Sequence, residues 1–229
     1  MIPHCVFGKA INHGPGVEGG FDAFQAQPTQ GLYALCDGAN SCLGSGRAAI
    51  WLAEQITQTA ETAGRVFIDS RARVVELHEQ MLTQFPVTAS TLIGLHVRPL
   101  GLRLFSVGDS QLTLYQPNRW SRKSWKKIHT MPLDIDENGH PSQLIASEIL
   151  HTVHQQDFPP APTWLAVLMS DGPAKYLSDA AIEAALLRIG HNTPSANDLD
   201  YLCQSLADEA LAAGCRDDVS LALVWIRYE

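Results

Sequence analysis

Four strongly apolar runs of this chain each carry an aspartate at one end. Asp37 closes "LYALCDGAN", Asp109 interrupts "LRLFSVGDSQL", Asp171 follows "LAVLMS", and Asp217 precedes "DVSLALVWI". Because an unpaired carboxylate is costly to remove from water, a buried strand has no use for one at its tip. A fold for this chain therefore has to bring these strand ends to water, to protons or to cations.

The composition is that of an acidic globular protein. With 229 residues the chain is long enough to bury a core, and we expect a single domain over residues 1–229. Its formal net charge of −8 argues against a nucleic-acid partner or an anionic membrane surface, since both require clustered Lys and Arg. The one basic stretch, residues 119–127, is short and is interpreted as a solvated loop edge.

The N-terminus and the cysteines indicate a cytoplasmic protein. The first residues lack a basic segment followed by an apolar one, and no run approaches the ~18 apolar residues of a membrane span. The five cysteines include no C-x-x-C pair, so we expect neither a disulfide framework nor a zinc site. We expect Cys36 to be a buried thiol that forms no bridge with Cys42.

Apolar periodicity and turn residues predict the strands and helices. Strands are expected at 31–38, 89–97, 100–107, 110–116, 125–131, 163–172 and 219–226, and helices at 45–63, 70–85, 179–189 and 195–213. Ser195 and Asp198 are typical of a capping box, and Gly214 suits the end of that helix. Residues 117–162 are mostly polar and give only a weak signal.

The predicted helices come in consecutive pairs. A single parallel sheet alternates strands and helices, so it suits this order poorly. We therefore predict an α+β fold, a four-layer αββα sandwich in which helix pairs flank two mainly antiparallel sheets.

The four acids favour a metal centre. Strand ends of two stacked sheets can meet at one edge, where carboxylates repel one another unless protons or cations lie between them. Oxygen ligands without a Cys/His cluster point to a hard cation such as Mg²⁺ or Mn²⁺. The alternative is that each aspartate is a turn or cap residue, which we would favour for one such motif but not for four.

The motifs also resemble those of a known family. "ASTLIGLHV", "LRLFSVGDSQLTLY", "WLAVLMSDG" and "RDDVSLALV" follow Asp37-Gly38 in the order seen in the metal-dependent protein serine/threonine phosphatases (the PPM, or type-2C, family). The resemblance extends from about residue 6 to residue 226. Its most specific part is "SVGDSQLTLY", which has Gln111 where the family usually has Arg.

The resemblance implies a hydrolase with two Mg²⁺ or Mn²⁺ ions. Asp37 would bridge both metals, and the carbonyl group of Gly38 would bind one of them. Asp171 and Asp217 would complete the protein ligands of the other metal. Water activated between the metals would attack phosphoserine or phosphothreonine in a protein substrate.

Two further acids have implied roles. Asp109, with Asp171, matches the acids that hold an accessory third metal in bacterial members of the family. Asp22 in "GGFDAF" matches an aspartate near the second metal. The implied partners are a phosphoprotein substrate and a cognate Ser/Thr kinase, with no nucleic acid and no membrane.

The chain departs from the family pattern where substrate is held. Val17 stands where the family has its phosphate-binding Arg, and Phe21 replaces a Glu. Residues 39–42 read Ala-Asn-Ser-Cys in place of a histidine-bearing segment, Ala89 replaces a glycine, and an Asp-His segment of the polar region is missing. By this resemblance the metal ligands are kept, whereas the family's residues for phosphate binding and leaving-group protonation have no direct counterpart.

The sequence leaves two questions open: which residue replaces the phosphate-binding Arg, and whether the protein is active. Lys9, His13 and Arg47 are candidates to replace the phosphate-binding Arg. The leading function is an active phosphatase, and the alternative is a catalytically weak or inactive regulatory or binding module. A haloacid-dehalogenase-type phosphohydrolase is disfavoured, because that class needs Asp-x-Asp and Asp37 is followed by Gly-Ala.

Overall fold

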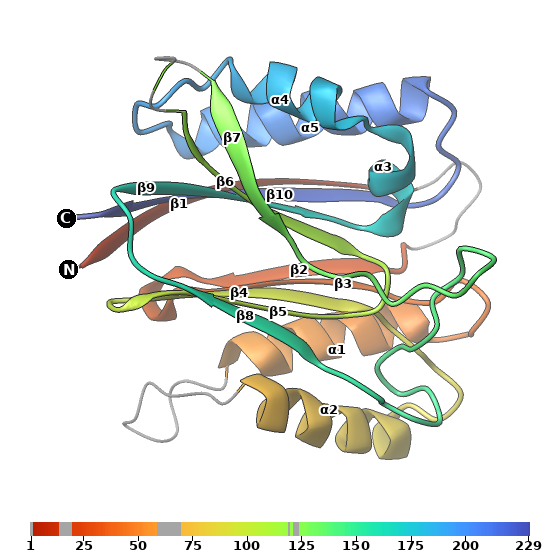
Figure 1. Cartoon of the computed structure of the whole chain (residues 1–229). Coiled ribbons are helices and arrows are strands. Elements are labelled where there is room, and N and C mark those ends of the chain that lie inside the picture. Colours follow the sequence, from red (N-terminus) through yellow and green to blue (C-terminus); the bar gives the residue numbers. More distant parts are fainter. Residues whose placement is uncertain (1, 14–19, 59–69, 119, 121–123) are drawn as a thin grey trace.

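A computed structural model describes residues 2–13, 20–58, 70–118, 120 and 124–229. It shows two five-stranded sheets stacked face to face, with helices on both outer faces (Figure 1). One sheet contains β1 (Pro3–Asn12), β10 (Val219–Tyr228), β9 (Thr163–Met169), β6 (Gln111–Pro117) and β7 (Trp125–Thr130), in that order. The other contains β2 (Asp22–Gln27), β3 (Leu32–Asp37), β4 (Leu92–Arg98), β5 (Gly101–Val107) and β8 (His154–Phe158).

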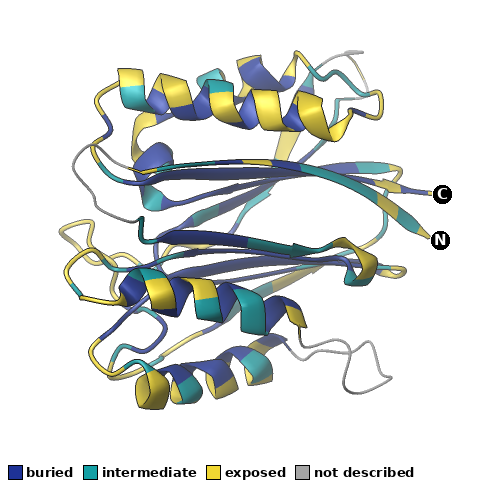
Figure 2. Cartoon of the chain, turned by 180° about the vertical axis from the view of Figure 1, so that it is seen from behind, coloured by how far each residue is buried: buried dark blue, intermediate teal, exposed yellow. Residues whose placement is uncertain are grey.

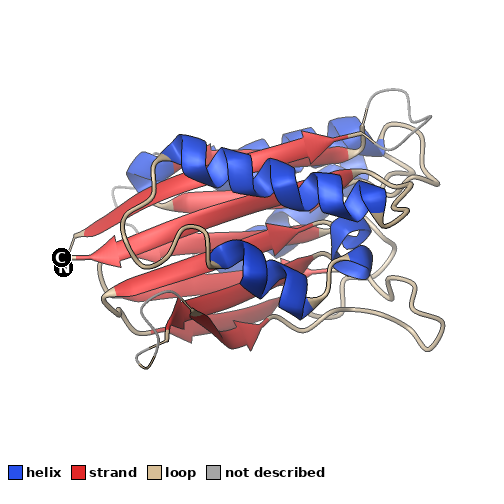
Figure 3. Cartoon of the chain, turned by 90° about the horizontal axis from the view of Figure 1, so that it is seen from above, coloured by secondary structure: helices blue, strands red, loops and turns tan. Residues whose placement is uncertain are grey.

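Every pairing within the two sheets is antiparallel, which confirms the predicted sandwich. The sheet that contains β10 is covered by α3 (Asp171–Tyr176), α4 (Asp179–Leu186) and α5 (Ala196–Ala212), and the other sheet by α1 (Ser45–Gln58) and α2 (Ser70–Gln84) (Figure 1). Seen from above, the long helices run roughly along the strands (Figure 3). None of the helices formed by the described residues is long and apolar enough to cross a membrane.

The core forms three apolar layers, one between the sheets and one under each set of helices. Central strands such as β9 and β10 are therefore buried on both faces (Figure 2). Such strands read as continuous apolar runs, without the alternation of half-exposed strands. This double burial explains why the acids at their ends stand out in the sequence.

Most predicted elements are present, and the differences have local causes. The predicted helix at 45–63 ends at Gln58 among the described residues, and 59–63 lie outside them. The capping box of Ser195 and Asp198 is confirmed, and Gly214 has the left-handed φ of 101° typical of a helix stop. The sequence did not predict β1, β2, β8 or α3. The edge strand β8 reads "HQQDF", which carries no apolar signal.

The thiols agree with the prediction. All five cysteines are free, and Cys36 of β3 is fully buried in the apolar layer beneath α1 and α2.

His96 on β4 is a neutral histidine in the core. Its side chain is only 2% exposed, and neither ring nitrogen has a hydrogen-bond partner in the part of the chain that the structure describes. Burial, with the charges of Arg98 and Arg103, lowers the pKa of His96 to about 4. Protonation of His96 in the folded protein is therefore strongly disfavoured.

We predict that His96 makes the protein sensitive to acid. The unfolded chain takes up a proton at His96 near pH 6.5, whereas the folded chain does so only near pH 4. The contribution of His96 to the free energy of unfolding is therefore fully present above pH 6.5. It is lost as the pH falls toward 4, and at pH 5 the loss is ~2 kcal/mol. Urea unfolding at pH 7.5 and pH 5 should show that His96→Leu loses less stability on acidification than wild type. A control, His151→Leu in an exposed loop, should behave as wild type, and an equal loss in all three would contradict the assignment.

Candidate functional site

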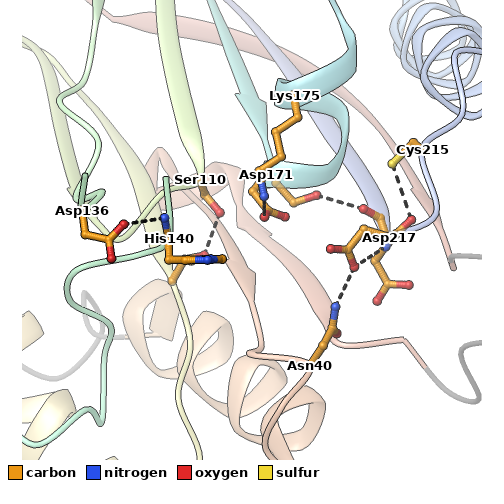
Figure 4. A network of polar contacts seen from close by, with 11 residues as sticks. Asn40, Ser110, Asp136, His140, Asp171, Lys175, Cys215 and Asp217 are labelled. Carbon is orange, nitrogen blue, oxygen red and sulfur yellow. Dashed lines mark hydrogen bonds and ion pairs between the residues drawn. The ribbon is translucent and has the colours of Figure 1, made fainter. Parts of the chain in front are cut away.

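The strand ends that carry the four acids meet at one edge of the sandwich, around a pocket of about 290 Å³. Asp37, Asp109, Asp171 and Asp217 all line this pocket. Figure 4 shows Asp171 and Asp217 facing each other across it, beneath Lys175. The structure thus brings together four of the six residues predicted for the metal centre. Gly38 and Asp22 do not line it; Gly38 follows Asp37 in the sequence, and Asp22 is paired with Asp37 in the sheet.

Asp37 is fixed by the neighbouring strands. Its N–H donates to Oγ1 of Thr91 at 3.0 Å, and its carbonyl oxygen accepts from the N–H of Thr91 at 2.8 Å. On the other side, the β2–β3 register places Asp22 directly opposite Asp37. Burial, with the charges of Asp22 and Asp171, raises the pKa of Asp37 well above its usual range.

Asp22 is a buried carboxylate that faces another acid. Its side chain is 7% exposed, and neither of its oxygens has a hydrogen bond of good geometry from a described residue. Burial raises the pKa of Asp22 to about 6, although the side chains of Ser220, Asp37 and Ser170 act to lower it. Two carboxylates opposite each other in a sheet destabilise it. Asp22 and Asp37 therefore form an acidic pair whose burial the neighbouring hydroxyl groups offset only in part.

The glycines beside the acids are required by close packing. A Cβ atom at Gly38 would lie 2.6 Å from the backbone of Ser45, and one at Gly172 would lie 2.2 Å from the carbonyl oxygen of Asp218. Gly38 forms an isolated β-bridge with Ser90 just beyond the end of β3, so the chain stays paired with its neighbour at this point.

Asp109 is positioned by a tight turn after β5. Gly108 has a φ of 96°, its N–H donates to Oδ2 of Asp134 at 2.9 Å, and its carbonyl oxygen accepts from the N–H of Asp134 at 2.9 Å. Nε2 of His154 lies 2.7 Å from the other carboxylate oxygen of Asp134. The buried Asp109 has its pKa raised to about 6, chiefly by burial and then by the charge of Asp171.

The two remaining acids have partners within the protein. Asp171 begins α3 and forms an ion pair with Lys175, one helical turn later. Oδ1 of Asp217 accepts from Nδ2 of Asn40 at 2.7 Å (Figure 4). The adjacent Asp218 is structural, because its Oδ2 accepts from the N–H of Phe21 at 2.6 Å and so joins the start of β10 to that of β2.

The pocket also has polar residues that were not predicted from the sequence. Lys175, Asn40 and His140 line it together with the acids. His140 belongs to the irregular segment between β7 and β8, where its N–H donates to Oδ1 of Asp136 at 2.9 Å. That segment has no apolar periodicity from which His140 could have been predicted. Asp171 and Lys175 are four residues apart, a spacing that suggests an ion pair within a helix, but no helix was predicted there.

The proposed replacements for the phosphate-binding Arg are elsewhere. Nζ of Lys9 lies 5.6 Å from the centre of the Phe24 ring, and Nδ1 of His13 lies 3.8 Å from Oδ1 of Asp218. Arg47 is exposed on α1, and none of the three lines the pocket among the described residues. Val17 lies outside the described residues.

The chemistry of the donors fits a hard divalent cation. The acids offer only oxygen ligands, and Asp37 lies beside the charges of both Asp22 and Asp171. As placed, however, no three His, Cys, Asp or Glu side chains of the described ranges are spaced to hold a metal ion. Cation binding therefore requires side chains such as Asp171 to turn away from their protein partners.

Comparisons with known proteins agree on the fold. No protein-family model and no curated protein matches the sequence. Among solved structures, PppA of Pseudomonas aeruginosa, described as a key regulatory component of T6SS, matches with a TM-score of 0.77 at 16% identity, over 96% of this chain and 97% of that one.

Two further phosphatases match over nearly the whole chain. A bacterial serine phosphatase has a TM-score of 0.73 at 16% identity, over 99% of this chain and 98% of the other. The catalytic domain of the serine/threonine protein phosphatase PstP, in complex with two manganese ions, has a TM-score of 0.72 at 18% identity, over 99% and 100%. The resemblance to the metal-dependent protein phosphatases is thus confirmed at the level of the fold.

We predict that Asp22 destabilises the metal-free protein. The pKa of Asp22 is about 6 in the folded protein, compared with its usual 3.8. Its contribution to the free energy of unfolding is therefore fully present below pH 3.8 and is lost as the pH rises to 6. Asp22→Asn should therefore stabilise the protein in EDTA at pH 7.5 by ~3 kcal/mol, and much less at pH 4. Urea unfolding at both pH values measures this, with Glu148→Gln in an exposed loop as the control. A variant less stable than wild type at both pH values would mean that Asp22 has a structural partner.

Proposed function

We propose that this protein is a Mg²⁺- or Mn²⁺-dependent phosphatase that hydrolyses phosphoserine and phosphothreonine in proteins. The observation that carries the proposal is the convergence of Asp37, Asp109, Asp171 and Asp217 on one pocket. The fold, shared with several bacterial serine/threonine phosphatases, supports it. We further propose that residues 1–229 act as one catalytic domain. The free cysteines suit the reducing cytoplasm.

An acidic pocket that binds a phosphate ester requires cations. A dianionic phosphoryl group is repelled by carboxylates a few ångströms away, in a partly buried site where charges are weakly screened. We assign Asp37, Asp171, Asp217 and the carbonyl group of Gly38 to the two principal cations, with Asp22 near the second of them. Asp109, together with Asp171, is assigned to an accessory third cation. When bound, such cations lower the pKa of water and neutralise charge on the phosphoryl oxygens.

The chain's own residues have two other tasks in this proposal. Asn40 holds Asp217 through its amide and so orients that carboxylate. His140 lines the pocket from the segment above it, and we assign it the proton for the leaving serine or threonine oxygen. The substrate is a phosphoprotein, and a cognate Ser/Thr kinase would supply it.

A regulatory or binding module with weak or no activity is the second candidate. It is favoured by the partners that already occupy two of the acids, Lys175 on Asp171 and Asn40 on Asp217. It is also favoured by the lining of the pocket, which includes no arginine among the described residues. The two candidates differ in turnover, which the following measurements test.

We predict that Mn²⁺ both activates and stabilises the protein. A cation that binds only the folded state raises the melting temperature, here by relieving the repulsion between Asp22 and Asp37. The measurements are the melting curve and the hydrolysis of para-nitrophenyl phosphate, each in EDTA and in millimolar Mn²⁺. Stabilisation without turnover would favour the binding module, and an unchanged melting curve would count against any metal centre.

We predict that the acids differ in importance. Asp37→Asn removes the charge assigned to both cations, so turnover should fall by a factor on the order of 10³ or more. Asp109→Asn should lower turnover by a smaller factor and leave the melting-temperature gain in Mn²⁺ in place. Kinetics of both variants across a Mn²⁺ titration compare them. Wild-type turnover in Asp37→Asn would overturn the assignment.

A further inference from the structure

His140 lies in a loop with a well-defined backbone, residues 134–142, which we call the His140 loop. The N–H of Asp136 donates to the carbonyl oxygen of His140 at 2.8 Å, and Ile135 forms an isolated antiparallel bridge with Pro141. The N–H of His140 also donates to Oδ1 of Asp136 at 2.9 Å. Figure 4 shows Asp136 beside His140, whose side chain points toward the acids of the pocket. Because the loop is held together internally, the position of His140 depends on where the loop is attached.

Asp134 attaches the His140 loop to the turn after β5. Its N–H donates to the carbonyl oxygen of Gly108 at 2.9 Å, and its Oδ2 accepts from the N–H of Gly108 at 2.9 Å. The carbonyl oxygen of Asp134 accepts from the N–H of Ser142 at 2.8 Å, which closes the base of the loop. The residue after Gly108 is Asp109, which lines the pocket. Asp134 thus joins the loop that carries His140 to the turn that carries Asp109.

His154 holds the second carboxylate oxygen of Asp134. It lies on the edge strand β8, where it is paired with Ser106 of β5, and its Nε2 is 2.7 Å from Oδ1 of Asp134. The side chains of Asp134 and His154 are 11% and 23% exposed, so their contact is largely shielded from water. A hydrogen bond to a carboxylate is stronger in such surroundings than at the surface. Asp134 is therefore fixed from two directions, by the turn after β5 and by β8.

Other attachments of the segment between β7 and β8 lie outside the His140 loop. The N–H of Met131 donates to the carbonyl oxygen of Leu112 at 2.9 Å, and Ile145 and Ser90 exchange backbone hydrogen bonds of 2.8 and 3.1 Å. These contacts do not involve the side chain of Asp134. The segment therefore stays attached to both sheets when that side chain is removed, whereas the base of the loop loses its fixed position.

We propose that Asp134, held by His154, is a positioning residue that aims His140 at the leaving oxygen of the substrate. This inference rests on the proposed function, in which His140 supplies the proton for that oxygen. Asp134 does not line the pocket, so it acts through the loop. A proton donor has to lie within hydrogen-bond reach of the atom that it protonates, and a shift of about 1 Å is enough to lower the rate.

The step in which His140 takes part balances as follows. The bond between phosphorus and the serine or threonine oxygen breaks, and its electron pair stays on that oxygen. The proton moves from the imidazolium group of His140 to the same oxygen. The attacking water supplies the new oxygen atom of the phosphate product, and one of its two protons restores His140.

The test compares two substrates in millimolar Mn²⁺ that differ in their need for this proton. The oxygen of a phosphoserine peptide leaves only with a proton, whereas para-nitrophenolate is a stable anion and leaves without one. Asp134→Ala should lower the ratio of kcat for the peptide to kcat for para-nitrophenyl phosphate by a factor on the order of 10 to 10², as His140→Ala should. The double variant should lower the ratio no further, since both substitutions remove the same proton transfer.

Two variants control for a merely structural effect. Asp134→Asn keeps an oxygen that accepts from Gly108 and gains an N–H that can donate to Nε2 of His154, so its ratio should stay near that of wild type. Asp157→Ala removes an aspartate at the other end of β8, where Arg98 and Arg103 hold it away from the pocket. It should leave the ratio unchanged.

The outcomes separate the inference from the proposed function. If Asp134→Ala lowers both kcat values equally while His140→Ala lowers their ratio, the inference alone is wrong and Asp134 is only structural. An unchanged ratio in His140→Ala would refute the assignment of the proton to His140, and the inference with it. A wild type that hydrolyses neither substrate in Mn²⁺ would overturn the proposed function as well.

Discussion

The repulsion between carboxylates at one edge of the sandwich is the interaction that the rest of the site depends on. Asp22 and Asp37 face each other because the β2–β3 register fixes them there, and the sheet hydrogen bonds prevent them from moving apart. Burial raises the pKa of both groups, and the charge of Asp22 raises the pKa of Asp37 further. The stability of two sheets and three apolar layers maintains an arrangement that would be unfavourable by itself. Such local cost is common where a protein prepares a binding site.

The acids of the site have chemically different surroundings. Lys175 and Asn40 provide partners for Asp171 and Asp217. Neither oxygen of Asp22, in contrast, has a hydrogen bond of good geometry from a described residue. The same residue type, at the ends of similar strands, therefore has different tasks. The neighbouring residues, and not the aspartates themselves, decide which acid is available to a ligand.

The sequence predicts the sandwich and four acids of the pocket, because doubly buried strands are continuous apolar runs whose ends are easily seen. The apolar pattern alone does not separate Asp217 from Asp218; the family resemblance favours Asp217, and the contact of Asp218 with Phe21 shows what the second acid does. His140 could not be predicted either, because the segment between β7 and β8 is held by particular contacts such as that of Asp134 with Gly108, which leave no periodic pattern. The edge strand β8 is missed for the related reason that its polar residues resemble those of a loop.

The acids come from both sheets, and this has a consequence for the core. Asp22, Asp37 and Asp109 extend from β2, β3 and β5, whereas Asp171 and Asp217 extend from β9 and β10. The spacing between these two groups is set by the thickness of the apolar layer that separates the sheets, ~10 Å in stacked sheets. Side chains of that layer, such as Leu35, Leu112 and Leu168, thus act as spacers for the ligands. A single methylene group added or removed there changes the distance between the two groups of acids without altering any residue that a ligand touches.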